Sequence, residues 1–250
     1  MNRDEEYRKF MNRKNLVSFT VMVKETDIAV QADKNLFDMA RESVFKFRGY
    51  IEAFIQRNPS FATSLVPWNI ESPAPLIINE MIKAGNLAGV GPMAAVAGAI
   101  AEFVGKDLLE HSEEVVVENG GDVFMKLNEP VTIGIYAGKS PLSMKLGLRL
   151  IPENRPLSIC TSSGTIGHSL SFGKSDAVCI ISHSCSLADA AATAIGNRIK
   201  SKADIKTAVQ EAGKINGILG AVAIIDDIIG LWGNLDIIPL TEECSRGKKG

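Results

Sequence analysis

The chain has 250 residues, of which 46% are hydrophobic and 22% are charged. These proportions are typical of a globular protein with a sizeable core, and they exclude a disordered or fibrous chain. The net charge is -2 and the 27 basic residues are scattered along the chain, which excludes a dedicated nucleic-acid surface.

The first half of the chain is predicted to combine one β-hairpin with several helices. Two β-branched apolar runs, at 16–23 and 26–32, are separated by a two-residue break and predict the hairpin. Apolar residues at helical spacing then predict three helices, at 34–57, at 76–84 and from Met93 onward.

The second half is predicted to consist mainly of strands. A tight turn at 119–122 joins a strand at 115–117 to a strand at 123–127. Further strands are predicted at 131–137, 144–150, 157–161, 177–182, 218–225 and 235–238, and further helices at 187–199 and 203–214. Strands in runs with helices grouped between them indicate an α+β fold. We expect one domain at 1–240, with room for two lobes, and a flexible tail at 241–250.

The location of the protein is predicted from three features. The N-terminal segment is charged from Arg3 onward, so it is not a secretory signal. The longest apolar run, at 218–225, is too short to cross a membrane, which takes about 20 residues. The four cysteines include no CxxC pair, which indicates free thiols in a reducing compartment. We therefore expect a cytoplasmic protein without a membrane partner.

Asp189 and Thr193 form the strongest candidate site. They lie four residues apart in the helix predicted at 187–199, so their side chains share one face. A carboxylate and a hydroxyl so placed can reach one hard cation, and Mg²⁺ prefers oxygen ligands supplemented by substrate phosphates. The same residues also fit two structural roles: a helix-capping box that begins at Ser186, and a bond from Thr193 to the preceding turn.

A loop rich in hydroxyl groups and glycines follows the strand predicted at 157–161. Its candidate ligand-binding residues are Thr161, Ser162, Ser163 and Gly164. Glycines permit turns that direct backbone N–H groups inward, and hydroxyls add donors for a phosphate or a carbonyl-rich ring. His168 in the same loop is a candidate catalytic acid/base. An ordinary turn and a serine hydrolase that uses Ser163 and His168 are alternatives, although the chain has no G-x-S-x-G elbow.

Two further glycine segments are candidate cofactor-binding sites. Gly89 and Gly91 lead into a small-residue helix, whose first-turn N–H groups are expected to be free for an anion. The second segment is the predicted turn, which consists of Asn119, Gly120, Gly121 and Asp122. Close helix packing explains the first segment equally well, and a plain hairpin turn explains the second.

Together these segments resemble the ApbE-like superfamily, best known for flavin transferases that use FAD and Mg²⁺ to attach FMN to a Thr or Ser of a partner protein. The chain is most similar to an uncharacterised cytoplasmic branch of that superfamily, and this similarity covers nearly the whole chain. It rests on AGVGPMAAVAGAIAE, VENGGD, AGKSPLS, CTSSGTIGHSLSFGKSDAV and LADAAATAIGN. The resemblance implies an ApbE-like α+β fold with mixed or antiparallel sheets and helices packed between them.

The resemblance also implies roles for individual residues. Asp189 and Thr193 match the family's side-chain metal ligands, and Ala97 matches an alanine whose backbone carbonyl binds the same ion. Residues 119–122 match a turn beside the flavin, and residues 161–164 match a segment along the nucleotide. His168 matches a family histidine.

Three departures from the family pattern limit what the resemblance implies. No D-P-R-T-G sequence follows His168, the family's early Y-D-P segment has no counterpart, and Gly98 replaces the lysine of the family's A-K-G. We therefore expect a protein that binds FAD, FMN or a related phosphorylated cofactor together with Mg²⁺. It is either an FMN transferase or pyrophosphate-cleaving enzyme, or a non-catalytic carrier or sensor. The sequence identifies no acceptor protein, and its apolar content is compatible with a homodimer.

Overall fold

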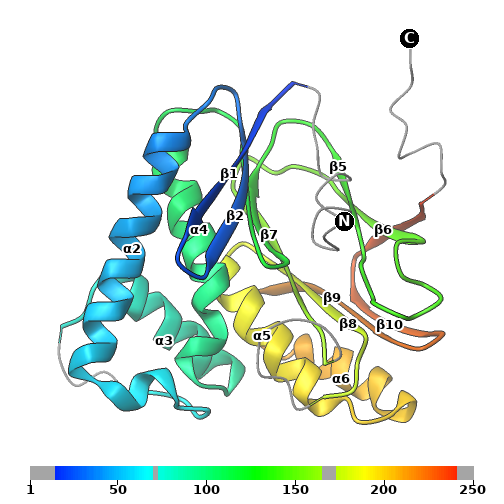
Figure 1. Ribbon diagram of the computed structural model, residues 1–250. Coiled ribbons are helices and arrows are strands. Elements are labelled where there is room, and N and C mark those ends of the chain that lie inside the picture. The colour runs from blue at the N-terminus through cyan, green and yellow to red at the C-terminus, as the bar shows by residue number, and fades with distance from the viewer. Residues whose placement is uncertain (1–14, 70–72, 165–172, 241–250) are drawn as a thin grey trace.

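The computed structural model describes residues 15–69, 73–164 and 173–240, and contains a large sheet, a small sheet and a group of helices (Figure 1). The strands of the large sheet, in spatial order, are β1 (Val17–Val23), β2 (Thr26–Ala32), β3 (Val115–Asn119), β4 (Asp122–Lys126), β7 (Leu157–Ser162), β8 (Ala177–Ser182), β9 (Ile218–Ile225) and β10 (Ile228–Gly233). The small sheet has the order β11 (Asp236–Pro239), β6 (Leu146–Leu150) and β5 (Val131–Gly134). All neighbouring strands in both sheets are antiparallel.

The helices lie between the strands in the sequence. They are α2 (Phe37–Arg57), α3 (Leu76–Ala88), α4 (Val96–Leu109), α5 (Cys185–Arg198) and α6 (Ile205–Ala212). Three short 3₁₀ helices accompany them: η1 (Pro59–Ala62), η2 (Pro92–Ala95) and η3 (Lys202–Asp204). No single helix in the described part of the chain has the length and apolarity needed to cross a membrane; α3 and the η2–α4 segment meet those criteria only as a pair bent by 106°.

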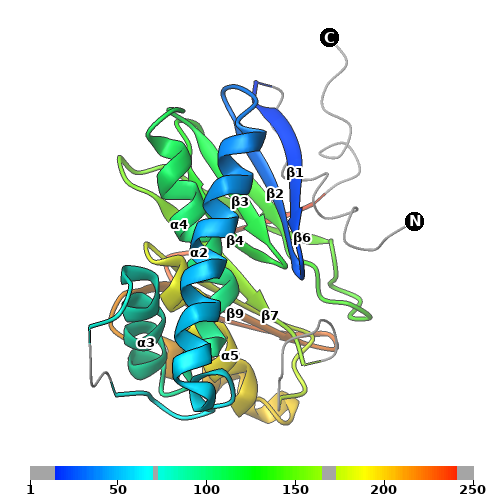
Figure 2. The ribbon, with the colours of Figure 1, turned by 60° about the vertical axis from the view of Figure 1, so that its left-hand side comes forward.

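The large sheet separates two hydrophobic cores, because successive strand residues point to opposite faces. Val117, Phe124 and Ile180 face the helices, and Val116 and Val123 lie in the core beneath the small sheet. The helices therefore pack on one face of the large sheet rather than between the two sheets. Figure 2 shows α2, α3 and α5 in front of the strands.

The α+β class and most predicted elements are confirmed. The hairpin at 16–23 and 26–32, the helix that ends before Pro59 and the turn at 119–122 are present. β10 has no counterpart among the predicted strands. It follows β9 through a two-residue turn in which Asp226 has a φ of 49°, and its half-exposed residues lack the buried apolar run that marks β9.

Candidate functional site

The candidate site is built where α4 crosses α5. A Cβ atom added at Gly98 would lie 2.5 Å from the carbonyl oxygen of Cys185 and 2.8 Å from the Cβ of Asp189, so the two helices touch through their backbones at this point. Only glycine permits this approach, because any larger side chain would collide with the backbone of α5.

Asp189 caps the first turn of α4 by accepting a hydrogen bond from its backbone. The backbone N–H of Gly98 donates to Oδ2 of Asp189 at 2.9 Å. First-turn N–H groups have no partner within their own helix, and the positive end of the helix dipole favours a carboxylate there. The sequence predicts free N–H groups for an external anion in the turn that follows Pro92, and the contact at Gly98 does not test that prediction. The N–H of Gly98, in the first turn of α4, is occupied by Asp189 of the same chain.

Ala97 lies beside this contact and is tied to the 119–122 turn. The side-chain amide of Asn119 donates to the carbonyl oxygen of Ala97 at 3.0 Å. The carbonyl that the resemblance assigns to the metal is therefore held by a hydrogen bond next to Asp189. Three segments that are far apart in the sequence meet at Ala97, Asn119 and Asp189.

The turn itself has the geometry that the sequence predicts. Asn119 and Asp122 are paired at the ends of β3 and β4, and the two glycines between them have φ values of 63° and 100°. Such values are readily adopted by glycine and suit a tight hairpin turn. The backbone N–H of Thr161 donates to the carbonyl oxygen of Gly121 at 3.2 Å. The turn is therefore also joined to the end of β7.

Asp122 and Asp189 form a carboxyl pair at this junction. Asp122 is only 6% exposed. Burial, and then the negative charge of Asp189, raise the pKa of Asp122 well above its ordinary range. Asp189 keeps partial solvent exposure, yet its surroundings remove enough water to raise its pKa to about 7, against the opposing effect of the Gly98 N–H. A bound cation would favour the ionised form of both groups.

The start of α5 differs from the capping box that the sequence allows. Ser184 is the N-cap, and its hydroxyl accepts from the N–H of Leu187. Ser186 lies inside the first turn, so the reading of Ser186 and Asp189 as a capping box is wrong.

Thr193 is partly exposed one turn beyond Asp189 on the same face of α5. Within the described part of the chain its hydroxyl makes no hydrogen bond to the preceding turn. Asp189 and Thr193 therefore lie one turn apart on α5, and their role as metal ligands stays a prediction.

Residues 161–164 run alongside α5. The hydroxyl of Thr161 bonds to the thiol of Cys179 at 3.3 Å, and the N–H of Gly164 donates to the carbonyl of Ser175 at 2.9 Å. The hydroxyl of Ser162 lies 3.8 Å from the position that a Cβ at Gly196 would take, near the end of α5. His168 lies outside the described residues, so its acid/base role and the hydrolase alternative stay predictions.

Gly89 and Gly91 both have structural reasons to be glycine. Gly89 ends α3 with a φ of 77°, which is the common left-handed C-cap. A Cβ at Gly91 would lie 1.8 Å from the carbonyl oxygen of Ser64. Close packing therefore accounts for this segment, and its proposed role in cofactor binding stays a prediction.

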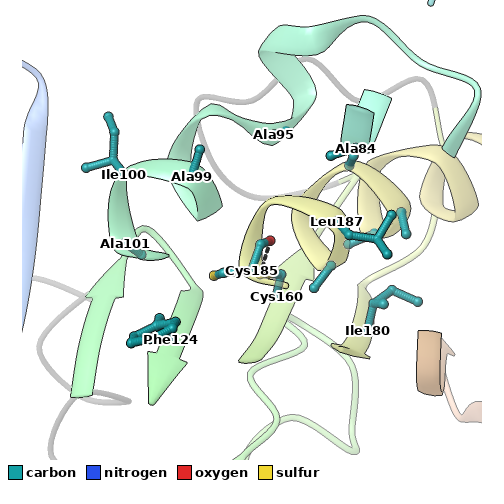
Figure 3. Packing of buried hydrophobic residues seen from close by; sticks show 14 of the residues in the cluster. Ala84, Ala95, Ala99, Ile100, Ala101, Phe124, Cys160, Ile180, Cys185 and Leu187 are labelled. Carbon is teal, nitrogen blue, oxygen red and sulfur yellow. Dashed lines mark hydrogen bonds between the residues drawn. The ribbon is translucent and has the colours of Figure 1, made fainter. Parts of the chain in front are cut away.

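Three buried thiols lie beneath the site. Cys160 and Cys185 face each other with 3.5 Å between their sulfur atoms, and the Cys160 thiol donates to the carbonyl oxygen of Cys185 at 3.4 Å (Figure 3). All three described cysteines are free, as the sequence predicts, and the structure shows that they are also buried. Burial raises the pKa of Cys160 well above its ordinary value, that of Cys179 to about 11, and also that of Cys185.

These thiols are expected to resist alkylation in the native protein at pH 7, because the thiolate is the reactive form and both burial and raised pKa values suppress it. The measurement is mass spectrometry of peptides after labelling of native protein and of protein unfolded in urea. Labelling of Cys244 is quantified separately, on the peptide that contains it. Fast native labelling of Cys160 or Cys185 would contradict the buried arrangement.

Glu102 on α4 is a candidate functional residue that no sequence motif identifies. It is only 4% exposed, and it bonds to the first turn of α5. The available signal is one carboxylate in the otherwise apolar run AGAIAEFVG, four residues after Gly98.

The described residues contain no group of three or more His, Cys, Asp and Glu side chains placed to hold a metal ion. A cation at Asp189 would therefore depend on neutral oxygens and on the phosphates of a ligand.

Comparison with known proteins places this chain in a family. The family described as "AbpE bacteria" matches residues 8–232. The chain belongs to this family. A UPF0280 protein of Methanocella arvoryzae is 44% identical over 214 residues, which cover 85% of this chain and 87% of the relative. A UPF0280 protein of Methanocaldococcus jannaschii is 40% identical over 229 residues, which cover 89% of this chain and 93% of the relative.

Two solved structures share the fold of this AbpE-family chain. The apo form of the flavinyl transferase ApbE of Pseudomonas stutzeri matches with a TM-score of 0.57 and 13% identity, over 87% of this chain and 93% of that structure. The ApbE protein of Thermotoga maritima matches with a TM-score of 0.52 and 13% identity, over 86% of this chain and 96% of that structure. The resemblance to an uncharacterised branch of the ApbE-like superfamily is therefore confirmed.

Proposed function

We propose that this AbpE-family protein binds FAD, FMN or a related phosphorylated cofactor where α4, α5 and the 119–122 turn meet. Mg²⁺ would be held there by the side chains of Asp189 and Thr193 and by the carbonyl of Ala97. The observation that carries the proposal is the joining of Asp189 to Gly98, 91 residues earlier in the sequence, directly beside Ala97.

The residues present fit Mg²⁺. All the proposed donors are oxygen atoms, and Mg²⁺ is usually bound through one or two carboxylates together with substrate phosphates. Oδ2 of Asp189 accepts the Gly98 N–H, and a carboxylate has further lone pairs on both oxygens. The ion, when bound, would neutralise charge that develops on the phosphates.

The chain's own residues would position the nucleotide. The segments at 161–164 and at Gly89 and Gly91 are proposed to seat the nucleoside and pyrophosphate, and residues 119–122 to lie beside the flavin. His168 is proposed as the acid/base. We propose that the protein acts in the cytoplasm.

Two reactions on FAD follow from this arrangement. In transfer, a Ser or Thr hydroxyl oxygen of an acceptor protein bonds to the phosphorus of the FMN moiety, the bond to AMP breaks and the hydroxyl proton is released. In hydrolysis, water takes the place of the hydroxyl, and the products are FMN and AMP. A solved structure that shares this fold is that of a flavinyl transferase, which supports the first reaction.

Asp189→Ala is expected to lower the rate of Mg²⁺-dependent AMP release from FAD by about 100-fold or more, because it removes the only proposed carboxylate ligand. The measurement is chromatography of AMP and FMN with and without Mg²⁺. Asp38→Ala changes an exposed aspartate on α2 and is expected to retain the wild-type rate. An unchanged rate in Asp189→Ala would rule out the assigned metal site.

A carrier or sensor is the second candidate, and the absence of the D-P-R-T-G and Y-D-P segments favours it. Its signature is thermal stabilisation by FAD or FMN without release of AMP from FAD. No thermal shift with either flavin would exclude both candidates.

A further inference from the structure

Glu102 makes a dense set of hydrogen bonds in an apolar interface. Its Oε2 accepts from the hydroxyl of Ser184 at 3.2 Å, and from the N–H and hydroxyl of Ser186 at 3.1 and 3.2 Å. Its Oε1 accepts from the ammonium group of Lys106 at 2.6 Å. One oxygen of the Glu102 carboxylate thus accepts hydrogen bonds from the start of α5, and the other pairs with a half-exposed lysine on α4 itself.

The two helices cap each other. Glu102 of α4 accepts from Ser186 in the first turn of α5, and Asp189 of α5 accepts from Gly98 in the first turn of α4. Each carboxylate therefore satisfies an N–H group that has no partner in its own helix, at the positive end of that helix's dipole.

The two contacts fix the register of α5 on α4. Gly98 and Glu102 lie four residues apart on one face of α4, and Ser186 and Asp189 lie three apart on α5. Two bonded points about one turn apart oppose both sliding and rotation of one helix against the other. The backbone contact at Gly98 leaves no space for a compensating shift.

An apolar side chain could fill this interface without the cost of burying a carboxylate. The burial of a carboxylate here therefore indicates that Glu102 holds α5 in a defined position on α4 and does not only fill space. We propose that Glu102 is a positioning residue for the metal-binding face of α5, and this inference rests on the proposed function. By holding the first turn of α5, it sets where Asp189 and Thr193 lie relative to the carbonyl of Ala97.

Mg²⁺ is a suitable probe of this role because it demands near-ideal octahedral geometry at short distances. Loss of a residue that orients a metal ligand typically weakens metal binding by about 10- to 100-fold. Binding of FAD without metal should be affected far less, since most of its proposed contacts lie outside α5.

The experiment compares the full-length wild type with Glu102→Gln and Lys106→Met. Titration calorimetry gives the Kd for MgCl₂ at saturating FAD and the Kd for FAD without metal, and thermal unfolding gives the Tm. Lys106→Met removes the other partner of Glu102 but leaves its bonds to α5, so it is the matched control. Glu102→Gln is expected to weaken Mg²⁺ binding by about tenfold or more, and Lys106→Met by less than about twofold, with FAD affinity nearly constant in both.

The outcomes separate this inference from the proposed function. If Glu102→Gln lowers the Tm but weakens Mg²⁺ binding no more than Lys106→Met does, Glu102 is only a helix cap and the inference is wrong. If the wild type shows no Mg²⁺-dependent binding of FAD, the proposed function fails and the inference with it. Should Glu102→Gln not fold, Ser186→Ala tests the same contact from α5. Several-fold weaker Mg²⁺ binding in that variant supports the inference, and unchanged binding overturns it.

Discussion

Gly98→Ala is expected to lower the free energy of unfolding by about 2 to 3 kcal/mol, the upper part of the range for overpacking a close contact. The added methyl group would lie 2.5 Å from the carbonyl oxygen of Cys185 and 2.8 Å from the Cβ of Asp189. Backbone atoms cannot rotate away, so α4 and α5 must separate. Separation also lengthens the bond from Gly98 to Asp189, so Mg²⁺-dependent nucleotide binding is expected to weaken as well. Chemical denaturation measures the first effect and titration with MgCl₂ the second.

Gly49→Ala is the matched control for this prediction. Gly49 lies inside α2, and a Cβ there would have no atom within 4 Å. Alanine is a better helix former than glycine by about 1 kcal/mol, so this variant is expected to be slightly more stable than the wild type. Equal stabilisation by Gly98→Ala and Gly49→Ala would show that α4 and α5 do not touch as described.

The free energy of unfolding of the ligand-free protein is expected to contain a contribution from Asp189 that declines between about pH 4 and pH 7. The folded protein raises the pKa of Asp189 from 3.8 to about 7 through burial, so it keeps a proton that the unfolded chain has already lost. The stabilisation is fully present below pH 4 and is lost as the pH rises through 7. Its size is up to about 4 kcal/mol, since each pKa unit corresponds to about 1.4 kcal/mol.

Asp189→Asn tests this contribution, because asparagine keeps the shape and an oxygen acceptor for Gly98 but does not titrate. The variant also removes the negative charge that raises the pKa of Asp122, so the comparison reports the carboxyl pair as a whole. The difference in unfolding free energy between wild type and this variant should decrease from pH 4 to pH 7. Asp204→Asn is the control, since hydrogen bonds from the backbone N–H of Lys200 and from Ser201 lower the pKa of Asp204, so its contribution changes only at more acidic pH. A flat difference for Asp189→Asn across the window would contradict the raised pKa of this carboxyl. FAD with Mg²⁺ should reduce the slope, because a cation favours the ionised form.

Local sequence patterns were sufficient for most elements and for part of the site. The side-chain period of a helix places Asp189 and Thr193 on one face of α5 whatever surrounds them. The two glycines at 120 and 121 specify a tight turn because they adopt positive φ at little cost. Likewise, β-branched apolar runs specified strands such as β8 and β9. These features depend on neighbours within a few residues.

Long-range contacts decided the rest. The local sequence offers both Ser184 and Ser186 as the N-cap of α5, and the structure uses Ser184. The hydroxyls of both serines and the N–H of Ser186 donate to Glu102, which lies more than 80 residues earlier in the sequence and could not be identified from local patterns. The partner of Asp189 is likewise a backbone N–H on another helix.

The tertiary structure also decided the chemistry of the proposed metal-binding face. The sequence by itself determined that a carboxylate and a hydroxyl share one side of a helix. Only the packing of α4, α5 and the 119–122 turn set Asp122 beside Asp189. Burial by this packing raises both pKa values, and the charge of Asp189 raises that of Asp122 further, and neither effect can be read from the local sequence.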